Sequence, residues 1–328
     1  MSYIRDFLLL AVVILLTFTQ TATAQTTSPP DQFGGVTTFQ GDNLGTIDQG
    51  KYRILNNRFG NPLAGQVVWR YAQQNFWDWG SWFEKTGFGS INAPAIVLGW
   101  HWWESKTNTG LPTRIWDNAP VMAQAEWSLT PTNNFRKLNV GYHMWFHDPD
   151  QLEGVLDWRD NPRAKISVWL HHEGDILPDG TWQDNVFYQG YEWEIWRGKS
   201  SAGWDVFTFR RYNGAPSIPN TELRLRDFIH EIVYFRGWMG NERFLTGVEF
   251  GPEVDYAINT VFQVTSNFHI NVEEEEVEPQ PQQESEPTGD TMYVSGRHLF
   301  SPTGEKVVLR GVNAGIAWLP VNLSLIHI

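Results

Sequence analysis

The sequence has 328 residues, no cysteine and a formal net charge of −13. Without cysteines the fold cannot rely on disulfides, and a chain of this length can bury a large core instead. Eight of the acidic residues, and no lysine or arginine, lie between residues 273 and 290, so the net charge is −5 when these eight are set aside. The sequence contains no basic patch and no nucleic-acid-binding motif, and no nucleic acid is expected as a partner.

The first 24 residues have the pattern of a secretory signal peptide. Arg5 precedes an apolar run from Phe7 to Leu16, and residues 22–24 read Ala-Thr-Ala, a suitable cleavage site. The apolar run is shorter than the roughly 20 residues that a membrane span needs. We therefore expect an exported protein, secreted or periplasmic, that begins near Gln25 and keeps no membrane anchor after cleavage.

Residues 25–272 are predicted to form the main domain, which is built mostly of β-strands. The expected strands are rich in Val, Ile, Phe, Tyr and Trp and fall at 66–73, 137–146, 164–170, 191–198, 204–211, 244–251 and 261–272. Between Thr221 and Phe235 apolar residues recur at helical spacing, with Asn220 or Thr221 as the expected N-cap. The pattern predicts a two-sheet sandwich with one amphipathic helix on its outer face, in which one sheet can bend to become concave.

The C-terminal part of the chain differs in composition. Residues 273–291 are rich in Glu, Pro and Gln and predict an extended linker that cannot build a core. Residues 292–328 begin a new segment. We expect that segment to be a truncated domain, with its last residues, LSLIHI, resembling translated sequencing adapter.

Tryptophan is the compositional outlier, with 18 residues, of which 17 lie between Trp69 and Trp238. Most of these rings are expected in the core. A flat indole can also offer its face to the apolar side of a sugar ring. An exported, β-rich chain with this excess of tryptophan therefore favours a carbohydrate substrate.

Several segments, in order along residues 50–272, resemble bacterial members of glycoside hydrolase family 12, the endo-β-1,4-glucanases and xyloglucanases. They are NNRFG at 56–60, APAIVLGWHWWESKTNTGLPTRI at 93–115, NVGYHMWF at 139–146 and FIHEIVYFRGWMGNERFLTGVEFGPEV at 228–254. The resemblance implies a β-jelly roll with a substrate groove across its concave sheet. It also implies a β-glucan polysaccharide as substrate and no cofactor or metal.

Within these segments the resemblance implies a set of sugar-contacting residues, namely Asn57, Phe59, Trp100, His101, Trp102, Trp103 and Trp145. Phe59 stands where the family has tryptophan and offers a smaller stacking surface. Strand alternation would place Trp100 and Trp102 on one face and His101 and Trp103 on the other, so that some line the groove and others fill the core.

A retaining glycosidase of this kind needs two carboxyl groups about 5–5.5 Å apart, one as nucleophile and one as acid/base. The resemblance places Glu253, in EFGPEV, at the acid/base position. Glu249 lies four residues earlier on the same strand face.

Two alignments compete for the nucleophile. In one, YEWEIW supplies Glu192 as the nucleophile. In the other, which we prefer, KISVWL takes that place and HHEGDILPDG becomes the following loop, because this register also explains the next two strands. The nucleophile position then holds Lys165, and the family's neighbouring aspartate falls on His143.

A lysine cannot replace the nucleophile, since an ammonium has no lone pair and its charge opposes an oxocarbenium-like transition state. Three hypotheses follow. The chain is a working glucanase that pairs Glu253 with Glu192, Glu194 or Glu249, or it is a glucan-binding domain with impaired catalysis. In the third, it is a lyase with Tyr142 or His143 as base.

Two further segments, at 171–173 and 293–313, also give predictions. His171, His172 and Glu173 are adjacent and lack the spacing of a helical metal site, so a surface loop is expected there. The segment YVSGRHLFSPTGEKVVLRGVN, 293–313, resembles the opening of a family 5 glycoside hydrolase. It implies a covalently attached family-5-like domain in the full-length gene.

Overall fold

The computed structural model describes residues 36–40, 45–58, 65–71, 78–89, 91–101, 104–105, 108–152, 162–212, 214–272, 292–295, 298–302 and 306–307. The chain divides into two compact units, Met1–Glu275 and Glu276–Ile328. The predicted signal peptide and the whole of the predicted linker at 273–291 lie outside the described residues.

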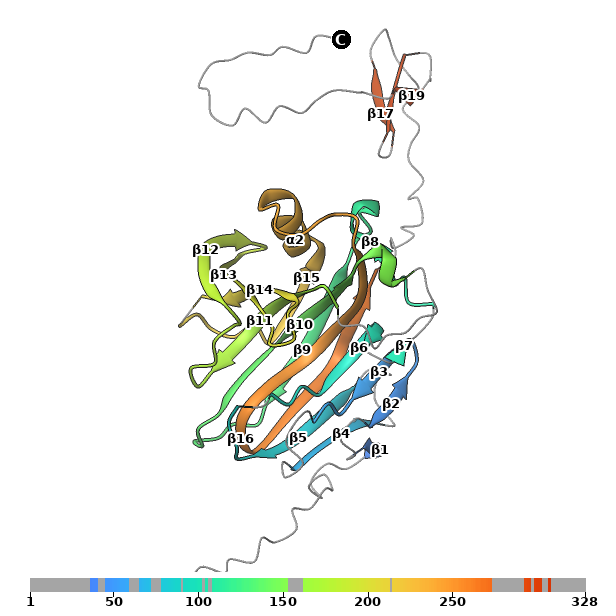
Figure 1. Cartoon of the computed structure of the whole chain (residues 1–328). Helices are drawn as coiled ribbons and strands as arrows, with labels where there is room; N and C mark the ends of the chain where they lie inside the picture. The colour runs from blue at the N-terminus through green and yellow to red at the C-terminus, as the bar shows by residue number, and fades with distance from the viewer. Residues whose placement is uncertain are drawn as a thin grey trace, which may run out of the picture. The chain divides into compact units, whose positions relative to one another are not determined.

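The first unit contains two β-sheets that share one strand (Figure 1). One sheet, here called sheet A, has the order β1, β4, β5, β16, β9 and β15. Its strands are β1 (Val36–Gln40), β4 (Gly65–Tyr71), β5 (Trp79–Lys85), β9 (Met122–Leu129) and β15 (Asn220–Arg224), together with the second half of β16.

The other sheet, sheet B, has the order β2, β3, β6, β16, β10, β11, β14, β13 and β12. Its strands are β2 (Thr46–Gln49), β3 (Tyr52–Leu55), β6 (Ala95–His101), β10 (Lys137–His147), β11 (Ala164–Glu173), β12 (Thr181–Tyr188), β13 (Tyr191–Lys199) and β14 (Asp205–Arg211). Short strands β7 (Glu104–Ser105) and β8 (Thr113–Arg114) pair with β6 and β16. Strands β11 and β14 are parallel, and the other pairs are antiparallel.

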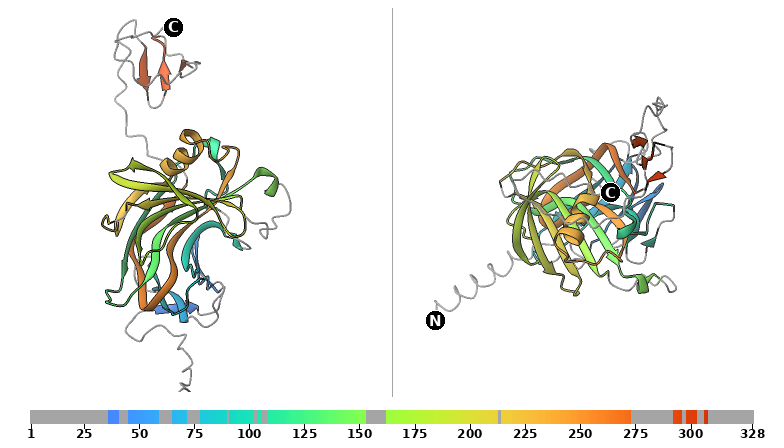
Figure 2. Two further views of the ribbon diagram at one scale, coloured as in Figure 1. Left: turned by 60° about the vertical axis from the view of Figure 1, so that its left-hand side comes forward. Right: turned by 90° about the horizontal axis from the view of Figure 1, so that it is seen from above.

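Strand β16 (Phe244–Asn271) is 28 residues long and belongs to both sheets. Its first half pairs with β6 and β10 in sheet B, and its second half pairs with β5 and β9 in sheet A. The sequence predicted two separate strands here, at 244–251 and 261–272. Figure 2 shows the long strands of sheet B bending strongly. The all-β, two-sheet jelly roll predicted from the sequence is confirmed.

The main core lies between the sheets, and β10 shows how the sequence builds it. Its even-numbered residues Leu138, Val140, Tyr142, Met144 and Phe146 are all fully buried in one apolar cluster. Because side chains alternate along a strand, the odd-numbered residues point to the opposite face of sheet B. That opposite face carries the candidate active site.

The predicted amphipathic helix begins later than expected. Residues Asn220–Arg224 pair with β9 as strand β15, and the α-helix α2 starts at Leu225 and ends at His230. A π-helical turn, Glu231–Phe235, continues it. The N-cap prediction at Asn220 or Thr221 is therefore wrong, because the backbone there is used by the sheet. The helical spacing places Phe228 against Trp193 and Phe209 on the core side of sheet B.

The second unit contains a small antiparallel sheet of β17 (Tyr293–Ser295), β18 (His298–Phe300) and β19 (Lys306–Val307). The resemblance of this segment to a family 5 enzyme remains a prediction. Among the described residues of the chain, no helix is both long and apolar enough to cross a membrane.

Candidate active site

Seven polar or aromatic residues lie together on the face of sheet B opposite the core, and we call this the polar face. They come from three adjacent strands in register: Asn139, His143 and Trp145 from β10, Lys165 and Ser167 from β11, and Glu249 and Glu253 from β16. The polar face is therefore set by strand alternation in residues far apart in the sequence.

Glu253 occupies the centre of a dense set of contacts on the polar face. Its Oε2 accepts a hydrogen bond of 2.8 Å from Asn139 Nδ2, and its Oε1 lies 2.9 Å from Lys165 Nζ and 3.9 Å from His143 Nδ1. Burial opposes ionisation of this carboxyl. The neighbouring His143 and Lys165 and the hydrogen bonds from Asn139 and Lys165 outweigh burial and lower the pKa of Glu253 to about 2.

Lys165 is held as a cation. Burial disfavours its charge, but the pKa is raised because Glu253, with smaller effects of Asp179 and Glu249, stabilises the ammonium. The Nζ atom also lies 5.5 Å from the centre of the Trp145 ring, within range of a cation–π interaction. Lys165, the residue of the preferred alignment, is thus the one that contacts Glu253.

Glu192, the nucleophile of the competing alignment, lies elsewhere. It is on β13, separated from β16 by β10, β11 and β14, and is exposed. Four strand spacings amount to about 19 Å along the sheet. Its Oε1 accepts a hydrogen bond of 3.1 Å from Asn185. The structure does not bring Glu192 beside Glu253.

His143, at the position where the resemblance implies an aspartate, is buried, and burial disfavours its charged form. Burial is the main cause of its lowered pKa, with Glu253 and Glu249 opposing the effect and Lys165 reinforcing it. Its Nδ1 lies 3.0 Å from the Ser167 hydroxyl. Within the part of the chain that the structure describes, its Nε2 has no hydrogen-bond partner.

Glu249 is engaged by a second chain of contacts at the edge of the polar face. His101 Nδ1 makes a very short contact with Glu249 Oε1, and His101 Nε2 lies 3.3 Å from Asn57 Nδ2. Since an amide Nδ2 can only donate, His101 Nε2 is the acceptor of that hydrogen bond. The ring proton is therefore on Nδ1, which donates a hydrogen bond to Glu249. This network orients Glu249 toward His101 rather than toward Glu253.

Glu194, the remaining alternative carboxylate, is locked in an ion pair. Arg210 approaches Glu194 Oε2 with both Nε, at 2.7 Å, and Nη2. The same oxygen accepts a hydrogen bond of 3.2 Å from Trp196 Nε1. Both charged side chains are about nine-tenths buried. Glu194 is therefore engaged in this ion pair and is not placed beside Glu253.

Three of the predicted sugar-contacting residues, Phe59, Trp102 and Trp103, lie outside the described residues. Trp100 is only 9% exposed, so little of its ring is available as a stacking surface. Trp145 is half-buried next to Lys165, with its ring edge-on to His101 and Trp204. Among the described aromatic residues that were predicted, Trp145 is therefore the one placed to meet a ligand.

Asp179 is an acidic residue, not predicted from the sequence, whose charge interacts with Lys165 and Glu253 of the polar face. It lies in the loop after β11, within the segment HHEGDILPDG. The loop returns over β13, where Gly180 and Gly198 pack so closely that a Cβ on Gly198 would lie 2.5 Å from Gly180 Cα. In the sequence, Asp179 is marked only by its place in the loop that follows β11. The position of that loop over β13 becomes visible only in the folded structure.

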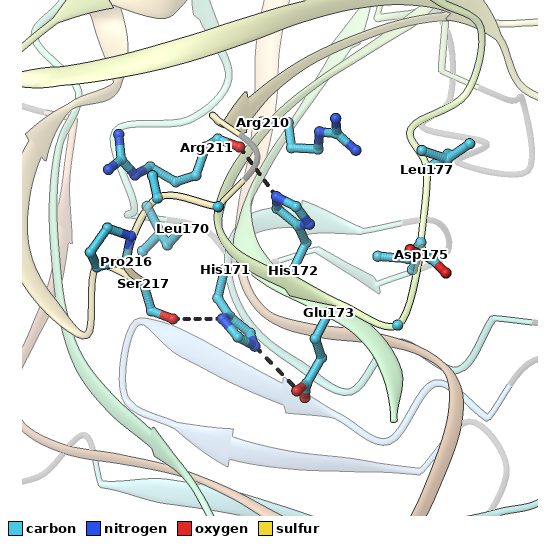
Figure 3. A pocket seen from close by; sticks show the side chains of 14 residues that line it. Leu170, His171, His172, Glu173, Asp175, Leu177, Arg210, Arg211, Pro216 and Ser217 are labelled. Carbon is cyan, nitrogen blue, oxygen red and sulfur yellow. Dashed lines mark hydrogen bonds and ion pairs between the residues drawn. The ribbon is translucent and has the colours of Figure 1, made fainter. Parts of the chain in front are cut away.

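A cavity of about 460 Å³ adjoins the same loop (Figure 3). In it, His171 Nδ1 lies 2.6 Å from Ser217 Oγ, and His171 Nε2 lies 3.7 Å from Glu173 Oε1. His172 Nε2 lies 3.2 Å from the Arg211 carbonyl. These histidines make separate contacts, and among the described residues no group of three or more His, Cys, Asp or Glu side chains is arranged to hold a metal ion.

A family model and a relative of known name both match the first unit of the chain. A family model described as glycosyl hydrolase family 12 matches residues 51–273. Endoglucanase S of Pectobacterium parmentieri is 29% identical over 214 residues, which cover 62% of this chain and 76% of that protein.

Solved structures of the same family share the fold. A family 12 xyloglucanase from Bacillus licheniformis superposes with a TM-score of 0.62 at 23% identity, covering 72% of this chain and 99% of that structure. An endoglucanase from Rhodothermus marinus superposes with a TM-score of 0.58 at 25% identity, with 72% and 99% covered.

Proposed function

Because the chain belongs to glycosyl hydrolase family 12 and is therefore a glycoside hydrolase, we propose that it hydrolyses β-1,4-glucans on the polar face of sheet B, in the manner of an endoglucanase or xyloglucanase. The observation that carries the proposal is the position of Glu253, which is held by Asn139 at the centre of that face. We further propose that the protein is exported through its N-terminal signal and is joined to a family-5-like domain in the full-length gene.

The low pKa of Glu253 limits what this residue can do. A general acid must carry its proton near the working pH, whereas a pKa of about 2 keeps Glu253 ionised in neutral and mildly acidic solution. As a carboxylate, Glu253 can accept a proton from water or stabilise positive charge on the sugar. The usual retaining pair would also need a second carboxyl group where Lys165 lies.

The ion pair between Lys165 and Glu253 favours a second candidate function. In that case the domain binds β-1,4-glucan on the polar face but hydrolyses it poorly, and its role is to deliver the attached enzyme to its substrate. The two candidates share the ligand and differ in turnover, so one experiment separates them.

The test uses the full chain with mixed-linkage β-glucan and xyloglucan. Release of reducing ends by the unaltered protein, and its loss in Glu253→Gln, support hydrolysis. No release, together with retarded migration in a gel that contains the polysaccharide, supports the binding function and contradicts hydrolysis. If Lys165 is what suppresses turnover, the double variant Lys165→Glu/His143→Asp gains activity, since it restores the two anionic positions of the family.

A further inference from the structure

Three aromatic rings from different parts of the chain meet at one end of sheet B, and we call them the aromatic platform. Phe88 lies in the turn after β5, Phe135 lies in the loop before β10, and Tyr256 lies on β16. The Phe88 and Tyr256 rings are stacked, with centroids 4.9 Å apart and an angle of 15° between their planes. The centroid of the Phe135 ring lies 5.7 Å from that of Tyr256, at an angle of 47°. Segments far apart in the sequence thus build one aromatic surface.

The aromatic platform is open to solvent. Phe88 is 63% exposed and Phe135 is 55% exposed, while Tyr256 is half-buried. Single apolar residues on a protein surface are common and need no explanation. A cluster of exposed rings is different, because contiguous apolar patches tend to mark surfaces that bind a ligand or a partner. The aromatic platform is therefore a candidate binding surface.

Buried polar contacts hold the aromatic platform in place. The backbone N–H of Gly89 donates a hydrogen bond of 2.8 Å to Asp255 Oδ1. The ammonium of Lys85, which is fully buried, donates to the carbonyl oxygens of Gly87 and Asp255. These contacts tie the turn after β5 to β16. Rings that are ordered before a ligand arrives lose less conformational freedom on binding, which favours affinity.

The aromatic platform lies on the same side of sheet B as the polar face. Tyr256 pairs with Lys137 on β10, and Glu253 pairs with Asn139, two residues further along β10. Lys137 and Asn139 are both odd-numbered residues of β10 and point away from the core. Two residues of a strand span about 7 Å. The aromatic platform and Glu253 therefore belong to one surface of the sheet but to separate sets of contacts.

The groups around the aromatic platform suit a sugar polymer. An aromatic face can stack on the apolar side of a pyranose, and the sugar hydroxyls then need hydrogen-bonding partners at the edge of the ring. Lys137 Nζ lies 5.9 Å from the centre of the Phe88 ring and is held there by Asp255 Oδ2 at 3.0 Å. Two exposed asparagines, Asn133 and Asn134, lie in the loop before β10. Aromatic faces and hydroxyl-binding groups thus occur side by side.

We propose that the aromatic platform is a second binding site for β-1,4-glucan, which holds sugar rings of the polysaccharide away from Glu253. This inference rests on the proposed β-glucan ligand and adds a site for it. In this site Phe88 and Phe135 stack on pyranose rings, while Lys137 and the two asparagines bind hydroxyl groups. A glucan long enough to occupy both the polar face and the aromatic platform is held more tightly than a short oligosaccharide.

The first experiment measures the migration of the full chain in native gels that contain mixed-linkage β-glucan or xyloglucan. The double variant Phe88→Ala/Phe135→Ala should bind roughly 3- to 10-fold more weakly than the unaltered protein, which is the loss expected when aromatic contacts are removed. Phe235→Ala is the matched control, because Phe235 is 74% exposed on the π-helical turn, and it should bind as the unaltered protein does. Equal retardation of the unaltered protein and the double variant would overturn the inference.

The same gels separate this inference from the proposed function. If the unaltered protein is neither retarded by the polysaccharide nor active on it, the proposed function fails and the second site fails with it. If the unaltered protein is retarded and the double variant is retarded equally, only the second site is excluded.

A further variant distinguishes stacking from a structural role of the ring. Phe88→Trp keeps an aromatic face of larger area and should bind the polysaccharide at least as tightly as the unaltered protein. Weakened binding in Phe88→Trp, equal to that in the alanine variant, would mean that the ring does not stack on sugar and would contradict the proposal.

Packing against a second copy of the chain is the alternative use of an exposed aromatic surface. Sedimentation velocity over a range of protein concentrations, with and without cellohexaose, tests it. We expect the unaltered protein and the double variant to sediment alike. A dimer that is lost in the double variant, and that cellohexaose does not dissociate, would assign the aromatic platform to self-association and overturn the proposal.

Discussion

Two ion pairs on the same face of sheet B illustrate different uses of a glutamate. Arg210 and Glu194 form a closed pair, in which two guanidinium nitrogens and Trp196 Nε1 all meet one carboxylate oxygen. Lys165 and Glu253 form an open pair, in which each Glu253 oxygen has a different donor and His143 lies within 3.9 Å. We expect the closed pair to stabilise the fold and the open pair to take part in catalysis. In the sequence, YEWEIW, which contains Glu194 of the closed pair, is nevertheless the more conspicuous motif.

The comparison is tested most strongly by removing each carboxylate in turn. Glu253→Gln should lower turnover of β-glucan by roughly 10²–10⁴-fold, because it removes the group that exchanges the proton. Glu192→Gln, an exposed carboxylate on the same sheet, should leave kcat/KM unchanged. Reducing-end assays on both variants measure the contrast, and a large loss in Glu192→Gln would reverse our assignment of Lys165 to the nucleophile strand.

Removing the closed pair should affect stability instead. Glu194→Ala leaves the Arg210 guanidinium buried without its anion, which should lower the free energy of unfolding by about 3 kcal/mol. Urea titration monitored by tryptophan fluorescence measures this change. The exposed Glu192→Ala serves as control and should alter it by less than about 0.5 kcal/mol. An undiminished midpoint in Glu194→Ala would mean that the closed pair does not stabilise the sheet.

The open pair should give the protein a characteristic loss of stability in acid. The pKa of Glu253 falls from 4.5 to about 2 on folding. Its stabilising contribution is therefore complete above pH 4.5, is lost as the pH falls toward 2, and amounts to something on the order of 3 kcal/mol. In Lys165→Met this contribution should shrink and disappear at higher pH. Identical acid unfolding curves for the two proteins would contradict the role of Lys165.

The smallest expected effect concerns the third donor of the closed pair. Trp196→Phe keeps an aromatic ring near Arg210 but removes the hydrogen bond to Glu194, which should cost about 1 kcal/mol of unfolding free energy. Trp182→Phe is the matched control, since Trp182 is exposed and its Nε1 donates an exposed hydrogen bond to Asn185 Oδ1. Thermal unfolding of both variants measures the difference, and equal midpoints would limit the closed pair to Arg210 and Glu194.

Sequence patterns predict the fold of this chain well because core strands show a regular alternation of apolar residues. The even-numbered residues of β10 are all apolar and all buried, and this alternation predicts a strand in a two-sheet sandwich. Strand β12 shows no such alternation because its residues are mostly exposed at the edge of sheet B. Strand β12 is therefore absent from the strands predicted from the sequence.

The candidate site is less predictable because it depends on register across strands. The contact of Lys165 with Glu253 joins residues 88 positions apart, and it follows from the pairing of β10 with both β11 and β16. Alignment of the loop and the next two strands was enough to favour Lys165 over Glu192. No sequence pattern places Asp179 near them, because its position depends on a glycine contact between the loop and β13.

Strand β16 also has a consequence for how the protein is made. Both sheets are completed by this one segment, and it comes last in the first unit. During synthesis the ribosome must therefore release nearly the whole unit before either sheet can acquire its central strand. Such long-range pairing is slow. Until β16 has emerged, the nascent chain exposes apolar strands, which makes it prone to aggregate.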